Sequence, residues 1–287
     1  MMGSTDFKAV LVIGYGKVAG DVLEYVWENE RAYGYKICYI EHEIYPFNRA
    51  MKFSQEKGIE NQTITDKQEL VNLFQQVSER TLIISASNNF LFPSSLLDKE
   101  NITVINFHNA LLPKFPGRNA PSWAIYENEK ITGITWHYVT ESVDAGDIIL
   151  QKCCNIDPDI KAYELARDLQ GLAFEGFQEC FFSVLEERVN AKKQDLSQRG
   201  RVYKSTDAPA NAHFTDKDLP ADIYRLLRAV DYGKNRIFPI VTGEWENIEI
   251  QIEGYKKIAK NKAEEKSNRL YLPLGEDLLE LKYTNKI

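Results

Sequence analysis

The sequence predicts an α/β protein: a Rossmann-like, mostly parallel sheet followed by a small, mostly β C-terminal domain. In the first two thirds of the 287-residue chain, short apolar runs alternate with segments whose apolar residues recur at helical spacing. The apolar runs are nearly continuous, as in parallel strands that helices cover on both faces. Short strands near the end of the chain indicate a separate β unit.

The first part of the chain is expected to contain four strands with three helices between them. Asp66 should cap the third helix, because an aspartate oxygen can accept a hydrogen bond from the first backbone N–H groups of a helix. The second helix should stop at Gly58. The expected strands are residues 8–16, 35–40, 80–87 and 102–108, and the expected helices are residues 17–30, 48–59 and 66–79.

A proline-rich loop follows the fourth strand, and a short helix should begin at Pro121, a residue suited to a first helical turn. Two further strands and a long amphipathic helix, weakened near Gly171, should complete the first domain. The helices are expected at residues 121–129 and 162–189, and the strands at residues 131–139 and 147–156.

Three regions are expected: a catalytic domain at residues 1–190, a polar linker at residues 191–217, and a C-terminal helix-plus-β domain at residues 218–287. In the last region a lysine-rich run at residues 256–269 is expected to be a solvated loop, with contact to an acidic partner as the alternative. The helix should be residues 219–233, and the strands residues 248–254, 269–275 and 278–284.

Composition argues against several classes of protein. The formal net charge of −7 argues against a general nucleic-acid binder, whose affinity depends on lysine and arginine contacts with phosphates. We find no apolar run long enough to span a bilayer and no secretory signal, so we expect a cytoplasmic protein without membrane contact. The cysteines form no Cys-x-x-Cys pair and are expected to be reduced thiols, not disulfides or metal ligands. They are Cys38, Cys153, Cys154 and Cys180.

The turn after the first strand reads "GYGKVAG", residues 14–20, and has the glycine spacing of a dinucleotide-binding turn. Glu41, at the end of the second strand, could supply the acidic residue that such a site needs. A lone glycine pattern is weak evidence, however. Small residues that open a helix show only that an anion could dock there, so we favour an anion of another substrate over a nicotinamide cofactor.

Asn106 and His108 end the fourth strand two residues apart, so both side chains should face one side of the sheet edge where ligands bind in open α/β folds. Asp144 lies in a glycine-containing loop that could return over the same edge. An amide can donate to a developing oxyanion, an imidazole can move protons, and a carboxylate can orient the imidazole and favour its cation. This set suits acyl transfer to a substrate amine. The other histidines are expected to be structural: His42, His137 and His213.

This region resembles the formyltransferase family that uses 10-formyltetrahydrofolate. The matching pieces are Asn106-x-His108, "LLP" at residues 111–113, Gly117, "GIT" from Gly133, and "VDAGDII" at residues 143–149. Their order and spacing fit over roughly residues 80–155. The resemblance implies the fold, the folate co-substrate, and a catalytic trio of Asn106, His108 and Asp144.

The resemblance also implies binding residues. One group should flank the pterin of the folate: Phe90, Leu91, Phe92, Val139, Thr140 and Val143. A second group should lie near the amine substrate or its phosphates: Gly14, Tyr15, Gly16, Lys17, Lys114 and Arg118.

The acceptor amine is left open by the sequence. Initiator-tRNA formyltransferases have a C-terminal β domain, but the basic insertion expected after the second strand is missing here. Glycinamide ribonucleotide enzymes usually end soon after the long helix. Relatives that formylate aminoacyl or natural-product amines, folate hydrolases and a non-catalytic nucleotide-binding protein also remain alternatives. We expect an amino group on a nucleotide-linked sugar, and a possible homodimer through the C-terminal domain.

Overall fold

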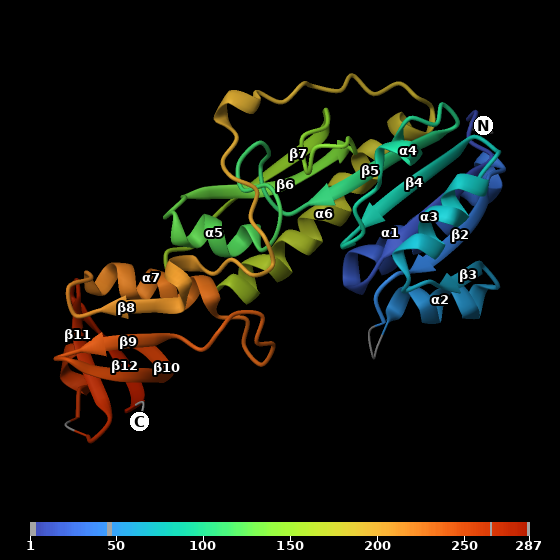
Figure 1. Ribbon diagram of the computed structural model, residues 1–287. Coiled ribbons are helices and arrows are strands. Elements are labelled where there is room, and N and C mark those ends of the chain that lie inside the picture. Colours follow the sequence, from blue (N-terminus) through green and yellow to red (C-terminus); the bar gives the residue numbers. More distant parts are fainter. Residues whose placement is uncertain (1–3, 45–47, 265, 286–287) are drawn as a thin grey trace. The chain divides into compact units, whose positions relative to one another are not determined.

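The computed structural model describes residues 4–44, 48–264 and 266–285 of the chain (Figure 1). Two compact units share these residues. The first contains Met1–Arg118, Thr132–Cys154 and Arg167–Val202, and the second contains Asn119–Ile131, Asn155–Ala166 and Tyr203–Ile287. The units are therefore interleaved along the chain, whereas the sequence led us to expect two continuous domains joined by a linker.

A seven-stranded sheet forms the first unit, in the order β3-β2-β1-β4-β5-β6-β7. Neighbouring strands from β3 to β5 are parallel, and β6 is antiparallel to β5. The α/β class and the mostly parallel sheet are confirmed. The strands are β1 (Ala9–Gly14), β2 (Lys36–Glu41), β3 (Glu60–Thr63), β4 (Thr81–Ala86), β5 (Ile102–His108), β6 (Ile131–Tyr138) and β7 (Ile148–Asn155).

The helices that follow these strands begin and end largely where the sequence predicts. Asp66 accepts a hydrogen bond from the N–H of Glu69 at 2.8 Å, so its expected role as an N-cap is confirmed. Gly58 adopts a left-handed conformation at the end of its helix, as expected. The helices are α1 (Gly16–Tyr33), α2 (Arg49–Lys57), α3 (Lys67–Gln76), a short α4 (Ser94–Leu97) and α6 (Ala162–Leu185).

The second unit combines two helices with a five-stranded sheet in the order β11-β12-β10-β9-β8. Its core is made by apolar side chains of α7, β10 and β12, among them Leu226, Ile250 and Leu279. The elements are α5 (Ala120–Tyr126), α7 (Pro220–Val230), β8 (His213–Thr215), β9 (Thr242–Trp245), β10 (Ile248–Ala259), β11 (Arg269–Leu274) and β12 (Asp277–Asn285).

The lysine-rich run is not a loop throughout. Its first four residues continue β10, where Lys256 pairs with Glu280 of β12 across the ladder at 3.2 Å. Lys257 is bonded to Asp159 at 3.0 Å. The expectation of a wholly solvated loop was wrong because the antiparallel partner β12 is long enough to extend the strand and offers a carboxylate opposite a lysine.

The expected linker is also divided. Lys192 forms a β-bridge with Ile148 in the first unit, while residues 203–217 belong to the second unit and include β8. Polar composition suggested a solvated connection, but polar side chains here bind backbone groups of the first unit, as described below. None of the helices in the described ranges combines the length and apolarity needed to cross a bilayer.

Candidate active site

The carboxyl end of β5 lies between β4 and β6, and the sheet register brings polar side chains from all three strands together. Asn106 is paired with Ser85 of β4 on one side and with His137 of β6 on the other. The Ser85 hydroxyl donates to Asn106 Oδ1 at 2.7 Å. The amide nitrogen of Asn106 donates to Nε2 of His137 at 3.2 Å and to the Phe107 carbonyl at 3.1 Å. The orientation of the Asn106 amide is therefore set by the neighbouring strands.

Asp144 lies against two imidazoles. Its Oδ2 is 3.4 Å from His108 Nδ1 and its Oδ1 is 3.5 Å from His137 Nε2. The backbone N–H of Gly117, in the proline-rich loop, donates to Asp144 Oδ2 at 2.7 Å. His108 and Asp144 are thus in direct contact, and Asn106 is connected to Asp144 through His137.

Burial and charge set the protonation states of this group. Burial raises the pKa of Asp144, but His108, His137 and the Gly117 N–H outweigh it, and the pKa of the carboxyl lies below its ordinary value. Burial lowers the pKa of His108, and the opposing effect of Asp144 only partly offsets it. At neutral pH the site therefore holds a carboxylate beside a neutral imidazole. Asp144 does favour the cation of His108, as expected, but desolvation of the buried ring outweighs this effect and keeps the pKa below its ordinary value.

Hydrogen-bond partners identify the proton-bearing nitrogens. The carbonyl of Phe115 can only accept, so Nε2 of His108, 2.9 Å away, carries the proton. By the same argument His137 carries its proton on Nδ1, which donates to the Tyr138 carbonyl at 2.8 Å. A second proton on His108 would sit on Nδ1, where Asp144 would stabilise it.

The loop that carries Asp144 is held in a conformation that is uncommon for residues other than glycine. Asp144 has a φ of 50°. Gln194 donates from Nε2 to the Asp144 carbonyl at 3.1 Å and to the Gly146 carbonyl at 2.6 Å, and Arg199 donates to the Val143 carbonyl. Two residues of the expected linker therefore hold the backbone of the loop that carries the Asp144 carboxylate.

Three residues of the site were missed from the sequence. His137 was treated as structural, although its position near the end of a strand next to β5 could have indicated a role. Ser85 ends an apolar strand, and its contact depends on the register between β4 and β5. Gln194 has no local signal, because it acts across about fifty residues of chain.

The expected folate-binding residues differ in how far they are exposed. Phe90 and Phe92 are buried in the core, where they contact each other and Phe74, so they do not form an open wall. Leu91 between them is 71% exposed. Val139 packs in part against the same core, and the Thr140 hydroxyl donates to the Ser142 carbonyl at 3.1 Å. Leu91 and Thr140 are the exposed members of the group, and Val139 and Val143 are half-buried.

The glycine turn has a structural reason of its own. Gly14 has a φ of 145°, and a Cβ there would lie 1.8 Å from the Ala86 carbonyl oxygen. The N–H of Tyr15 donates to the Ser87 carbonyl at 3.3 Å, and Gly16, with a φ of 73°, faces open space. Gly14 is thus needed for close packing of β1 against β4 whether or not a ligand binds.

The candidate cations of the amine site differ in availability. Lys17 forms an ion pair with the buried Asp21, which also pairs with Arg49. Lys114 is exposed on the proline-rich loop. Arg118 is half-buried, and within the described ranges its guanidinium makes no hydrogen bond or ion pair. Arg118 is therefore better placed than Lys17 to bind an anionic substrate.

Glu41, the residue that a dinucleotide site would require, is occupied. It is buried and accepts hydrogen bonds from Asn48 Nδ2 at 2.6 Å and from the Thr63 hydroxyl at 3.0 Å. A ribose would have to displace both donors, so the local structure disfavours a nicotinamide cofactor. The adjoining residues 45–47, part of the region where a basic insertion was sought, lie outside the described residues.

Comparison with known proteins gives consistent matches. Residues 39–180 match the family model described as "Formyl transferase". The methionyl-tRNA formyltransferase of Clostridioides difficile (strain 630) is 26% identical over 163 residues, 57% of this chain and 52% of that protein. The same enzyme of Acetivibrio thermocellus (strain ATCC 27405) is 36% identical over 158 residues, 52% of this chain and 48% of that protein. The chain thus spans about half the length of these curated relatives.

Solved structures match over nearly the whole chain. WlaRD, a sugar 3N-formyl transferase solved in the presence of dTDP and 5-N-formyl-THF, has a TM-score of 0.73 at 20% identity, covering 98% of this chain and 99% of that one. The N-formyltransferase from Helicobacter canadensis, in complex with folinic acid and dTDP-3-aminofucose, has a TM-score of 0.73 at 15% identity, covering 97% and 100%. The fold is therefore shared from end to end. The matched segment contains Asn106, His108, His137 and Asp144, and the matches together support a formyltransferase family for this chain.

Proposed function

We propose that this protein transfers a formyl group from 10-formyltetrahydrofolate to a primary amine, and that the amine belongs to a nucleotide-linked amino sugar. The single observation that carries the reaction type is the contact of Asp144 with His108 and His137, next to the amide of Asn106. No serine or cysteine nucleophile lies within hydrogen-bond distance of His108 in the described structure. Direct attack by a substrate amine follows from this arrangement.

The folate supplies an activated formyl group, and the residues of the chain supply charge stabilisation and proton transfer. One N–H of the Asn106 amide exchanges its resting acceptor, His137 Nε2 or the Phe107 carbonyl, for the oxygen on which negative charge develops as the amine adds. His108, neutral beforehand, takes up the proton that the amine loses, and the ionised Asp144 stabilises the resulting cation. Reprotonation of the departing folate nitrogen returns His108 to its neutral form.

The proposed acceptor rests on two observations. Sugar N-formyltransferases match both units of the chain, whereas methionyl-tRNA formyltransferases match about half of it. In addition, Arg118 offers an unpaired, half-buried guanidinium on the loop that donates to Asp144, where it could contact a diphosphate. A tRNA acceptor is the second candidate, because the sequence relatives are initiator-tRNA enzymes.

The test is an acceptor panel with purified full-length protein and 10-formyltetrahydrofolate, in which release of tetrahydrofolate and mass of the product are followed. The panel contains dTDP-linked 3-amino and 4-amino sugars, the corresponding free sugars, glycinamide ribonucleotide and methionyl-tRNA. We expect formylation of a nucleotide-linked amino sugar. Release without any amine would indicate a hydrolase, and formylation of methionyl-tRNA alone would replace the proposed acceptor.

Matched variants connect the reaction to the structure. Arg118→Met should raise KM for the sugar nucleotide while leaving KM for the folate unchanged. Arg236→Met, an exposed arginine of the second unit, serves as the control. The proposed homodimer through the C-terminal domain is checked separately by light scattering coupled to gel filtration.

A further inference from the structure

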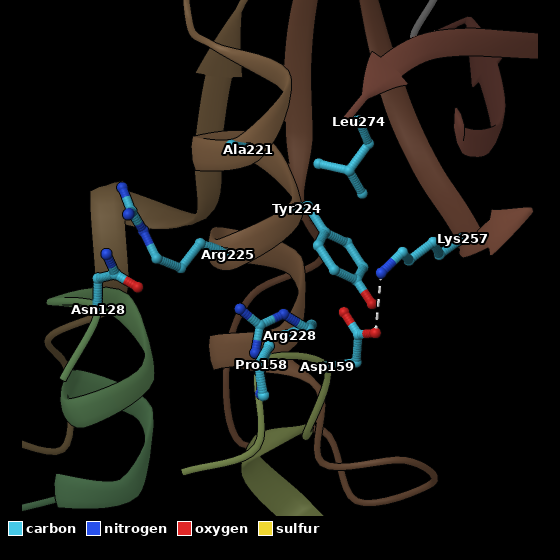
Figure 2. Close-up of a pocket in the computed structure, with 9 residues that line it drawn as sticks. All are labelled: Asn128, Pro158, Asp159, Ala221, Tyr224, Arg225, Arg228, Lys257 and Leu274. Carbon is cyan, nitrogen blue, oxygen red and sulfur yellow. Dashed lines mark hydrogen bonds and ion pairs between the residues drawn. The ribbon is translucent and has the colours of Figure 1, made fainter. Parts of the chain in front are cut away.

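A pocket of about 240 Å³ is lined only by residues of the second unit, and none of them is among the residues assigned to formyl transfer. Figure 2 shows side chains from three regions around it: Asp159 from the segment before α6, Arg225 and Arg228 from α7, and Lys257 from β10. Three of these four side chains are cationic. The pocket therefore differs in charge from the chain as a whole, whose formal net charge is −7.

Arg228 is the unusual member of the group because it is only 7% exposed. Its Nη1 donates to the Ile160 carbonyl at 2.9 Å, and its guanidinium lies 4.9 Å from the centre of the Tyr224 ring. Its Nε is buried and has no hydrogen-bond partner. No carboxylate within the described ranges lies within ion-pair distance of Arg228; the Asp159 carboxylate attracts it from further away, but is largely exposed and already bonded to Lys257.

A buried charge without a counterion is costly. Transfer of a cation from water into a protein is compensated only by close opposite charge and saturated hydrogen bonding. Burial lowers the pKa of Arg228, yet an arginine side chain stays protonated in proteins. The second unit therefore carries a desolvated positive charge that its own residues leave partly uncompensated.

The other two cations of the pocket have partners that water already screens. Arg225 pairs with Asp222, whose side chain is 45% exposed. Lys257 contacts Asp159 at 3.0 Å and Asp277 at 3.8 Å, and both carboxylates are also well exposed. Exposed pairs of this kind are weak, so an incoming anion could compete for both cations. Arg225 Nε is, like Arg228 Nε, buried without a partner.

We propose that this pocket is a second ligand site, which binds the phosphate group of a small phosphorylated molecule against Arg228, Arg225 and Lys257. A guanidinium presents paired donors that match phosphate oxygens, and a lysine adds a point charge. The volume of about 240 Å³ accommodates a phosphate with a small attached group, but is small for a complete nucleotide-linked sugar. The bound dianion would add to the partial counter-charge that Asp159 provides for Arg228.

The experiment measures binding of inorganic phosphate to the full-length protein by isothermal titration calorimetry at constant ionic strength. We expect saturable binding that Arg228→Met weakens at least tenfold, because methionine keeps much of the apolar stem and removes the charge. Lys257→Met, on an accessible strand, should weaken binding several-fold. Arg236→Met, an exposed arginine elsewhere in the unit, should leave binding unchanged.

Stability gives an independent measurement. Without phosphate, Arg228→Met should be as stable as the wild type or more stable, because an uncompensated buried charge is gone. Saturating phosphate should raise the Tm of the wild type and of Arg236→Met, but not that of Arg228→Met. A structural role limited to the bond with Ile160 predicts the reverse: a less stable variant with an unchanged response to phosphate.

Two pairs of ligands test whether the site binds a phosphorylated metabolite or free phosphate. Glucose 1-phosphate and thymidine 5′-monophosphate are compared with glucose and thymidine in the wild type and in Arg228→Met. Tighter binding of a phosphate ester than of inorganic phosphate identifies a phosphorylated metabolite, and equal binding identifies free phosphate. Equal affinities of wild type and Arg228→Met for every phosphate, or binding of an RNA oligonucleotide without binding of any small phosphate, would overturn the proposal.

Discussion

Asp144→Asn is the substitution that tests the active-site geometry most directly. Asparagine keeps the shape of the side chain and removes the charge that faces His108 Nδ1 at 3.4 Å. Two unit charges at this distance interact by about 5 kcal/mol at an effective dielectric constant of about 20. That energy corresponds to roughly 3.5 pKa units for the imidazole. The variant would therefore strongly disfavour the cationic form of His108 that proton uptake requires.

If most of this interaction is expressed in the transition state, turnover should fall by about three orders of magnitude. The assay is tetrahydrofolate release with the acceptor found by the panel, measured from pH 5 to pH 9. The pKa of His108 should fall further below its ordinary value in the variant, so any acid limb that reports this group should move to lower pH. A folded Asp144→Asn protein with turnover within tenfold of the wild type would refute the reasoning.

The same carboxylate links stability to pH. The pKa of Asp144 is depressed in the folded protein, since the effects of His108, His137 and Gly117 together outweigh burial. The Asp144 carboxylate therefore contributes fully to the free energy of unfolding above about pH 4, the ordinary pKa of an aspartate in an unfolded chain. This contribution is lost as the pH falls through the lower pKa that Asp144 has in the folded protein. The difference in unfolding free energy between wild type and Asp144→Asn should narrow below about pH 4, as measured by urea titrations. A constant difference down to pH 2 would contradict the lowered pKa.

Three further predictions concern other parts of the site and its support. His108→Ala should lower turnover by about two to four orders of magnitude, the range for general acid–base groups, while circular dichroism shows an intact fold; near-normal turnover would remove His108 from the mechanism. Ser85→Ala should lower kcat with little change in KM, because Asn106 Oδ1 loses the 2.7 Å hydrogen bond from the Ser85 hydroxyl. Ser85→Thr keeps a hydroxyl and should restore part of the rate. An unchanged kcat in Ser85→Ala would show that Asn106 needs no such support. Gly14→Ala should lower the free energy of unfolding, measured by urea titration, by at least about 2 kcal/mol. The added Cβ would lie 1.8 Å from the Ala86 carbonyl oxygen, and the residue has a positive φ. Gly16→Ala is the matched control, with a smaller loss of stability, because a Cβ at Gly16 would face open space.

Much of the fold could be predicted because its signals are local. Apolar runs bounded by caps such as Asp66 and Gly58 define helices and strands within about ten residues of chain. Alternation of side chains along a strand was enough to place Asn106 and His108 on one side of the sheet edge. The first residues of the lysine-rich run were expected to be a loop, but they form a strand. That strand depends on pairing with β12, which is not adjacent in sequence and leaves no local signal in the run itself.

The acid–base group was predicted only in part. Asn106, His108 and Asp144 were found from residue type, strand position and the resemblance to a family. The protonation state of His108 could not be predicted, because burial of its ring depends on the packed site. Burial lowers the pKa of His108 and outweighs the increase that the neighbouring Asp144 carboxylate causes.

By itself, the sequence determined the α/β class, the ends of the strands that carry the site, and the residue types available for formyl transfer. Only the tertiary structure decided that His137 connects Asn106 to Asp144, that Gln194 holds the Asp144 loop, and that Arg228 is buried without a carboxylate in ion-pair contact. Periodicity and capping act over one or two turns of chain and can be read from the sequence. Register, burial and the pairing of charges depend on segments that fold together from distant positions.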